Sequence, residues 1–114
     1  GSNGDAPAAK EEIYVSIDGF SLTDGITLGI SSKVTTGGSS FITVGDAATV
    51  AVHLVAADAA DFANAKTVPV KSLTIHANAA TKATITADEL ARAIKENGLQ
   101  GKAFFKVRLV KGAR

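Results

Sequence analysis

The amino-acid sequence predicts an all-β fold: an antiparallel β-sandwich of about seven to eight short strands, with one short α-helix before the last strand. Apolar and polar residues alternate with a period of two over much of the chain from Ile13 onward, as half-buried strands require. Turn-forming residues interrupt this alternation about every eight to twelve positions. The length of 114 residues suits one domain. A jelly roll is the nearest competing architecture.

Seven segments show strand alternation, and an eighth, residues 82–86, leads into the helix. In the first segment Ile13, Val15 and Ile17 share one face, which we expect to be buried. A turn containing Gly37-Gly38 separates the second segment from the third. The seven expected strands cover residues 13–17, 26–30, 41–44, 49–56, 67–70, 73–77 and 103–110.

The clearest strand is residues 49–56, in which larger aliphatic side chains at even positions point one way. Residues 57–65, rich in Ala, Asp and Asn, follow it. We expect them to form a loop or a single helical turn that tucks Phe62 inward. Lys71-Ser72 predicts a break between the next two strands.

The helix is expected over about residues 87–97. Thr86 and Glu89 have the spacing of a capping box, in which each side chain accepts a hydrogen bond from the backbone of the other residue. Leu90 and Ile94 share one face. Asn97-Gly98 predicts a left-handed stop.

Composition narrows the class of protein. Lys and Arg number 12 against 11 Asp and Glu, so the net charge is +1 and we expect no nucleic-acid partner. The absence of Cys excludes disulfides, thiolate zinc sites and thiol catalysis. The chain also lacks Trp, the flat ring most suited to stacking on sugars, so we expect no direct glycan binding.

The chain also lacks Met, so we expect a processed or excised segment. Gly1-Ser2 has the form of a cloning scar, and residues 3–10 predict a flexible tether. We therefore set residues 1–10 apart from a single β-sandwich domain, residues 11–114. No apolar run approaches the roughly 20 residues of a membrane span, so we expect any membrane contact to use an anchor outside this segment.

No pattern of catalytic, cofactor-binding or metal-binding residues emerges, and we expect a non-enzymatic protein without cofactor or metal. His53 and His76 have no His or carboxylate within two residues, which favours packing or surface roles. No nucleophile motif of the type G-x-S-x-G occurs. Gly37-Gly38 lacks the Lys and helix of a phosphate-binding loop. The Asp residues predict turns and caps, although the sequence leaves open a calcium site built across two loops.

The last expected strand carries a possible interaction face made of Phe104, Lys106 and Arg108. These residues alternate with apolar residues and so share one side of the strand. A ring with two cations suits an acidic partner or single-stranded nucleic acid. A solvated outer face with lysines that guard a sheet edge explains the same pattern, and we favour it from the residues alone.

Three short motifs in the second half of the chain point to a family. They are Asp61-Phe62 after a strand, Thr86 with Glu89 and Leu90 at a helix start, and the set Gly98-Leu99, Gly101-Lys102 and Val107-Arg108. With them the chain resembles the N-terminal immunoglobulin-like domain of SusE-type outer-membrane lipoproteins. The resemblance implies an immunoglobulin-like structural or interaction module of an exported bacterial surface protein, a spacer in a polysaccharide-utilisation system. It also implies a protein partner and a location at the cell surface or the periplasm-facing outer membrane.

A second resemblance is to the small capsid cement or decoration proteins of tailed phages. Residues 49–66 and 105–114 are similar to segments of those proteins. That resemblance implies a non-enzymatic protein of the virion that stabilises the phage head.

Overall fold

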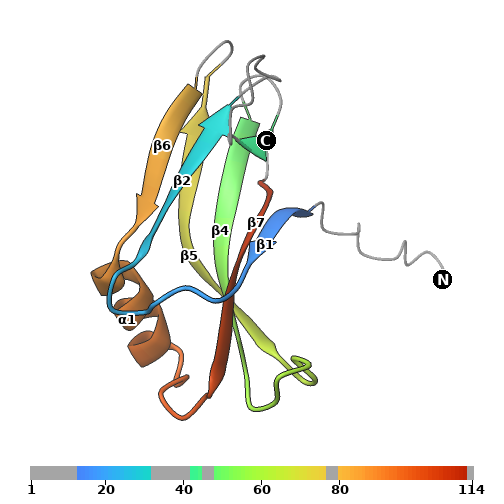
Figure 1. Cartoon of the computed structure of the whole chain (residues 1–114), viewed down its shortest axis with the longest axis vertical. Coiled ribbons are helices and arrows are strands. Elements are labelled where there is room, and N and C mark those ends of the chain that lie inside the picture. The colour runs from blue at the N-terminus through green and yellow to red at the C-terminus, as the bar shows by residue number, and fades with distance from the viewer. Residues whose placement is uncertain (1–12, 32–41, 45–47, 77–79, 113–114) are drawn as a thin grey trace, which may run out of the picture.

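The computed structural model describes residues 13–31, 42–44, 48–76 and 80–112 (Figure 1). The expected tether, the turn at Gly37-Gly38 and Asp46 lie outside the described residues. In chain order the elements are β1 (Ile13–Ile17), β2 (Ile26–Ser31), β3 (Ile42–Thr43), β4 (Ala48–Ala57), β5 (Lys66–Ile75), β6 (Ala80–Ile85), α1 (Ala87–Glu96) and β7 (Phe104–Lys111).

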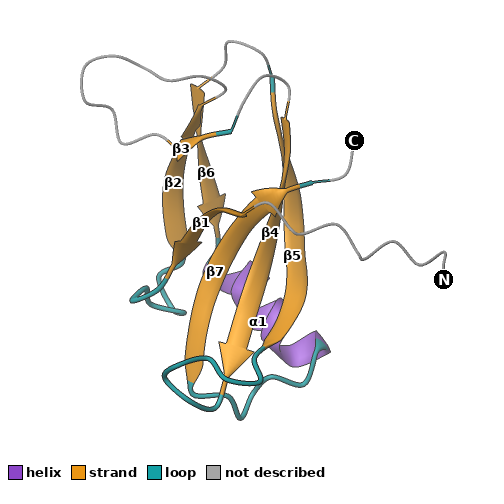
Figure 2. Ribbon diagram, turned by 90° about the vertical axis from the view of Figure 1, so that its right-hand side faces the viewer, coloured by secondary structure: helices purple, strands orange, loops and turns teal. Residues whose placement is uncertain are grey.

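The strands form two sheets. One has the order β1-β7-β4-β5 with antiparallel neighbours, and the other has the order β3-β2-β6, in which only the short β2–β3 pair is parallel. Figure 2 shows α1 behind the four-stranded sheet, on the side where β2 and β6 also lie. We call this side of the four-stranded sheet its inner face and the opposite side its outer face. The arrangement confirms a mostly β, two-sheet fold with one helix before the last strand.

The hydrophobic core fills the space between the inner face, the smaller sheet and α1. The prediction for residues 49–56 is confirmed, because Val50, Val52 and Leu54 of β4 are fully buried. Burial of one such side chain contributes roughly 1.5–3 kcal/mol, which makes this cluster the main source of stability. The other large side chains of the cluster are Ile26, Ile30, Val44, Ile75, Ile85, Leu90, Leu99, Val107 and Leu109.

The break expected at Lys71-Ser72 is wrong, because β5 is one continuous strand of 10 residues. Its pairing with β4 shifts by one residue, so that Val52 lies opposite Lys71 while His53 lies opposite Pro69. Val70 is the extra residue. One added residue exchanges the two faces of a strand. The bulge therefore accounts for the interrupted alternation that led us to expect a break. It also places Lys71 on the inner side.

A second irregularity changes the faces of β1. The register with β7 shifts between Ile13 and Val15, so Val15 and Ile17 face the core whereas Ile13 lies opposite Val110. The expectation that Ile13 is buried is therefore wrong, and its side chain is 49% exposed. Tyr14 instead packs against the core.

The helix has the predicted caps. Glu89 N donates to the Thr86 hydroxyl at 3.1 Å, and Thr86 N donates to Glu89 Oε1 at 2.8 Å. At the other end Asn97 is the C-cap and Gly98 has the expected left-handed conformation, with φ +68°. Leu99 then returns to the core, fully buried.

One ion pair joins the helix cap to both sheets. Lys71 Nζ of β5 donates to Glu89 Oε1 at 2.9 Å and to the carbonyl oxygen of Thr84 in β6 at 2.6 Å. The hydrogen bond from the Thr86 backbone is the main cause of a lowered pKa for the Glu89 carboxyl; the Lys71 ammonium lowers it further, and burial opposes both. The carboxylate of Glu89 therefore serves the helix cap and the contact between sheets together.

We expect Glu89→Gln to lower the free energy of unfolding at neutral pH by about 0.5–1 kcal/mol, a range that allows for solvent screening of a partly exposed pair. The folded-state pKa is depressed, so the contribution of the charge is present above the unfolded-state pKa. It disappears as the pH falls through the folded-state pKa. Urea unfolding at several pH values tests this, and a gap between wild type and variant that persists undiminished in acid contradicts it. Glu96→Gln removes an equal charge near the helix C-terminus and should not destabilise.

Gly25→Ala should destabilise strongly. A Cβ at Gly25 lies 2.5 Å from the Ile85 carbonyl oxygen and 3.2 Å from the Ala87 nitrogen, at a backbone φ of +74°. Gly19 has a similar φ of +70° but open space around the added atom, so Gly19→Ala isolates the conformational penalty. We expect about 1 kcal/mol for Gly19→Ala and at least about 3 kcal/mol for Gly25→Ala in urea unfolding. Equal losses would show that the close approach to the junction of β6 and α1 is unimportant.

Candidate interaction site

Phe104, Lys106 and Arg108 share the outer face of β7, as the alternation predicted. The intervening Val107 and Leu109 are fully buried on the inner side. Phe104 is 39% exposed, and Lys106 and Arg108 are half-buried. Whether these side chains bind a partner remains a prediction.

The strand register places further residues around these three. Arg108 lies between His53 of β4 and Ser16 of β1, and Val110 lies between Ala51 of β4 and Ile13 of β1. We call Ile13, Phe104, Lys106, Arg108 and Val110 the outer strip. Ile13 and Phe104 are the exposed large hydrophobic residues found among the described part of the chain, and they stand at opposite ends of this strip. The strip is therefore apolar at its ends and cationic between them.

Phe62 joins the site in a way that the sequence did not predict. The expectation that Phe62 tucks inward is wrong, because its ring is half-buried outside the core cluster and lies 4.4 Å from Lys106 Nζ. The ring can lie there because Phe62 has φ +58°, a left-handed conformation that is rare for an aromatic residue. Asn64 in the same loop has φ +56°. An ammonium at this distance from a ring is within cation–π range.

The two loops at this end of the sheet are joined by an ion pair. Lys102 Nζ lies 3.1 Å from Asp58 Oδ2, and the Ala103 nitrogen donates to the Ala57 carbonyl oxygen. Asp61 Oδ1 accepts a hydrogen bond from Ala63 N, which is the turn role that the sequence predicted for it. These contacts hold the loop that carries Phe62 against the end of the sheet.

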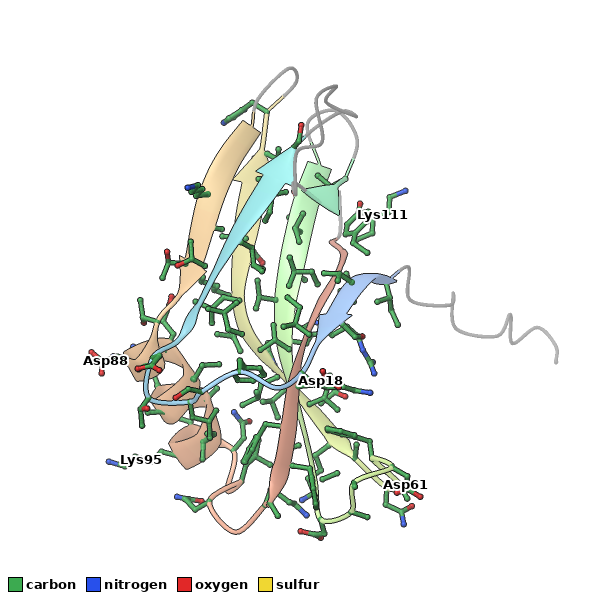
Figure 3. The ribbon with its side chains drawn as sticks, in the orientation of Figure 1. Asp18, Asp61, Asp88, Lys95 and Lys111 are labelled. Atoms are coloured by element: carbon green, nitrogen blue, oxygen red, sulfur yellow. The ribbon has the colours of Figure 1, made fainter. Side chains whose placement is uncertain are left out.

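The four strands of the larger sheet contain no Asp or Glu. They contain five of the basic residues, namely Lys66, Lys71, Lys106, Arg108 and Lys111. Lys71 is engaged by Glu89 on the inner side. Figure 3 labels Asp18 and Asp61 in the loops beside the sheet, and Asp88 on the helix across the molecule. The strands of the larger sheet therefore carry positive and no negative side chains.

The two histidines are not brought together. His53 lies on the outer face beside Arg108, and its Nδ1 is buried, as is Nε of Arg108. His76 is exposed just beyond the end of β5. Within the described ranges, no three His, Asp or Glu side chains gather in a way that could hold a metal ion.

A groove of about 230 Å³ lies between β5 and α1, away from the outer strip. Its walls are Pro69 and Val70 on the strand and the charged side of the helix, including Asp88, Arg92 and Glu96. Glu89 also lines it but is already bound by Thr86 and Lys71. The groove thus presents ordinary helix-surface charges of both signs.

Searches of protein-family models, curated proteins and solved structures found no match to this chain. The two family resemblances seen in the sequence therefore stay predictions. Among the described residues, α1 is too short to cross a membrane.

We expect Phe62→Gly to be at least as stable as Phe62→Ala. Both variants remove the ring beneath Lys106, but only Ala keeps a Cβ in the left-handed conformation, which costs about 1 kcal/mol. At an ordinary loop position the order is reversed, because Gly adds entropy to the unfolded chain. Thermal unfolding of the two variants measures the order, and a clearly more stable Ala variant would argue against the left-handed conformation.

Proposed function

We propose that this chain is a non-catalytic immunoglobulin-like module of an exported bacterial surface protein and that it binds another protein through the outer strip. The observation that carries the proposal is the outer strip itself, with an exposed ring at one end, an exposed aliphatic side chain at the other and two cations between them. Aromatic and Arg side chains are enriched in protein interfaces. A rigid sheet displays this strip, so little order has to be created on binding.

The strand order supports the immunoglobulin-like part of the proposal. If the two-residue β3 is left uncounted, β2 and β6 are the second and fifth strands and pair in one sheet. β4 and β7 are then the third and sixth strands and pair in the other. These are the pairings of an immunoglobulin sandwich, and β5 stands beside β4 as the additional strand of variable-type domains does.

The sequence resemblance supports the cellular setting. The motifs shared with SusE-type lipoproteins include the residues of the helix cap, Thr86 and Glu89. In this chain Glu89 also accepts a hydrogen bond from Lys71, which joins the two sheets. A surface module that acts as a spacer and also binds a partner needs a stable fold and a binding face. Both are supplied here by the same four-stranded sheet.

The test is site-specific photocrosslinking of the natural full-length protein in the organism that encodes it. A photoreactive residue replaces Phe104 in one variant and Arg92, on the exposed side of α1, in the control. We expect one defined adduct with a cell-envelope protein from position 104 and none from position 92. Adding Lys106→Glu should reduce the adduct about tenfold, the effect of losing about 1.4 kcal/mol of binding free energy.

Three outcomes contradict the proposal. The first is the same set of adducts from both positions, which indicates random collision. The second is recovery of the protein outside the cell envelope. The third is its recovery with phage heads, which replaces the surface module by the capsid decoration protein of the second resemblance.

A further inference from the structure

The edge of β7 next to β1 is only partly covered. β1 pairs with β7 between Ile13, opposite Val110, and Ile17, opposite Val107. On its other side β7 pairs with β4 along its whole length, as far as Phe104 opposite Ala57. Within the residues that the structure describes, residues 104–106 therefore have a strand on one side only.

The chain leaves this edge immediately after β1. Asp18 and Gly19 follow Ile17, and Gly19 takes a φ of +70°, which turns the backbone out of the strand. Phe20 and Leu22 then pack against the core on the way to β2. Figure 1 shows this connection passing from β1 toward the helix side of the molecule, so it does not continue along β7.

The side chains at the uncovered edge belong to the outer strip. Phe104 is 39% exposed there, and Lys106 lies over the ring of Phe62, which holds its ammonium near the end of the sheet. The four strands of the sheet contain no Asp or Glu, and Asp18 follows directly after β1. An ordered edge therefore coincides with a cationic and aromatic surface.

This inference rests on the proposed function. We propose that the partner contributes an extended acidic segment, which pairs with residues 104–106 of β7 and lies in line with β1. Strand addition at a free edge supplies backbone hydrogen bonds, and alternate side chains supply specificity. One face of the added strand projects beside Phe104 and Lys106, where an apolar and then an acidic side chain fit. The segment extends the pairing of the β7 edge beyond the part that β1 covers.

An acidic peptide is favoured over single-stranded nucleic acid by the same geometry. Nucleic acid needs a cationic groove with rings on which successive bases stack, and it makes no backbone pairing with a strand edge. Here the positive charge lies beside a strand edge, residues 104–106, that has no neighbouring strand within the described residues. A polypeptide can pair with such an edge through its backbone.

The experiment titrates the whole chain, labelled with ¹⁵N, with a peptide of about eight residues, a length within the usual range for a strand. The peptide has Thr at every second position and Leu and Glu in turn at the others, so that one face of the extended peptide alternates apolar and acidic side chains. We expect amide shift changes centred on residues 104–106. The same peptide with Lys in place of Glu should bind at least about tenfold more weakly, which corresponds to about 1.4 kcal/mol. A version N-methylated on alternate amides keeps its charge but loses donors, and it should weaken binding by a similar factor.

Matched variants separate the edge from general charge. Lys106→Glu should reverse the preference between the Glu and Lys peptides. Lys95→Glu makes the same charge change on α1, which lies on the inner side of the sheet (Figure 2), and should leave the preference as it is.

Several results overturn the inference. Shift changes confined to the groove between α1 and β5 place the site elsewhere, and undiminished binding of the N-methylated peptide shows that the edge is not used. Binding of a short oligothymidylate as tight as that of the Glu peptide assigns the surface to nucleic acid. If the peptide does not bind but the photocrosslink from position 104 still forms in cells, this inference is wrong and the proposed function stands. Failure of both removes both.

Discussion

The contact between Lys71 and Glu89 couples elements that are distant in the chain. The carboxylate of Glu89 caps the helix through Thr86 N and accepts a hydrogen bond from Lys71 of the edge strand β5. The same ammonium donates to the carbonyl oxygen of Thr84 at the end of β6. One pair of charges therefore joins the larger sheet, the smaller sheet and the helix. This geometry depends on the bulge at Val70, because without the added residue Lys71 points to the outer face.

The outer face of the larger sheet carries the outer strip. Val55 and Val110 are almost fully buried although they do not belong to the core cluster. Their neighbours across the strands include Lys106 and Ala51. Long cationic side chains bury their aliphatic stems along apolar surface while their charged ends stay accessible. The outer strip combines the exposed Ile13 and Phe104 with the half-buried cations Lys106 and Arg108.

Most secondary structure was predictable because it depends on local patterns. The alternation of β4, the capping box of Thr86 and Glu89, and the placing of Phe104, Lys106 and Arg108 on one side of β7 all appear in the structure as expected. The failures are the two bulges and the loop of Phe62. A bulge and a turn both interrupt alternation, so the sequence around Lys71 did not distinguish them. No sequence pattern predicts the left-handed conformation of Phe62, because the intrinsic backbone preference of an aromatic residue disfavours a positive φ.

The sequence by itself determined most of the strand segments, where the helix starts and stops, and which three residues of β7 share a face. A spacing of two residues, or of three to four, decides these features. Only the tertiary structure decided which strands are neighbours, that Ile13 lies on the outer face beside Val110, and that Phe62 reaches Lys106. It also decided that β1 covers only part of the edge of β7. These features depend on contacts between residues far apart in the chain, where packing and register outweigh local preference.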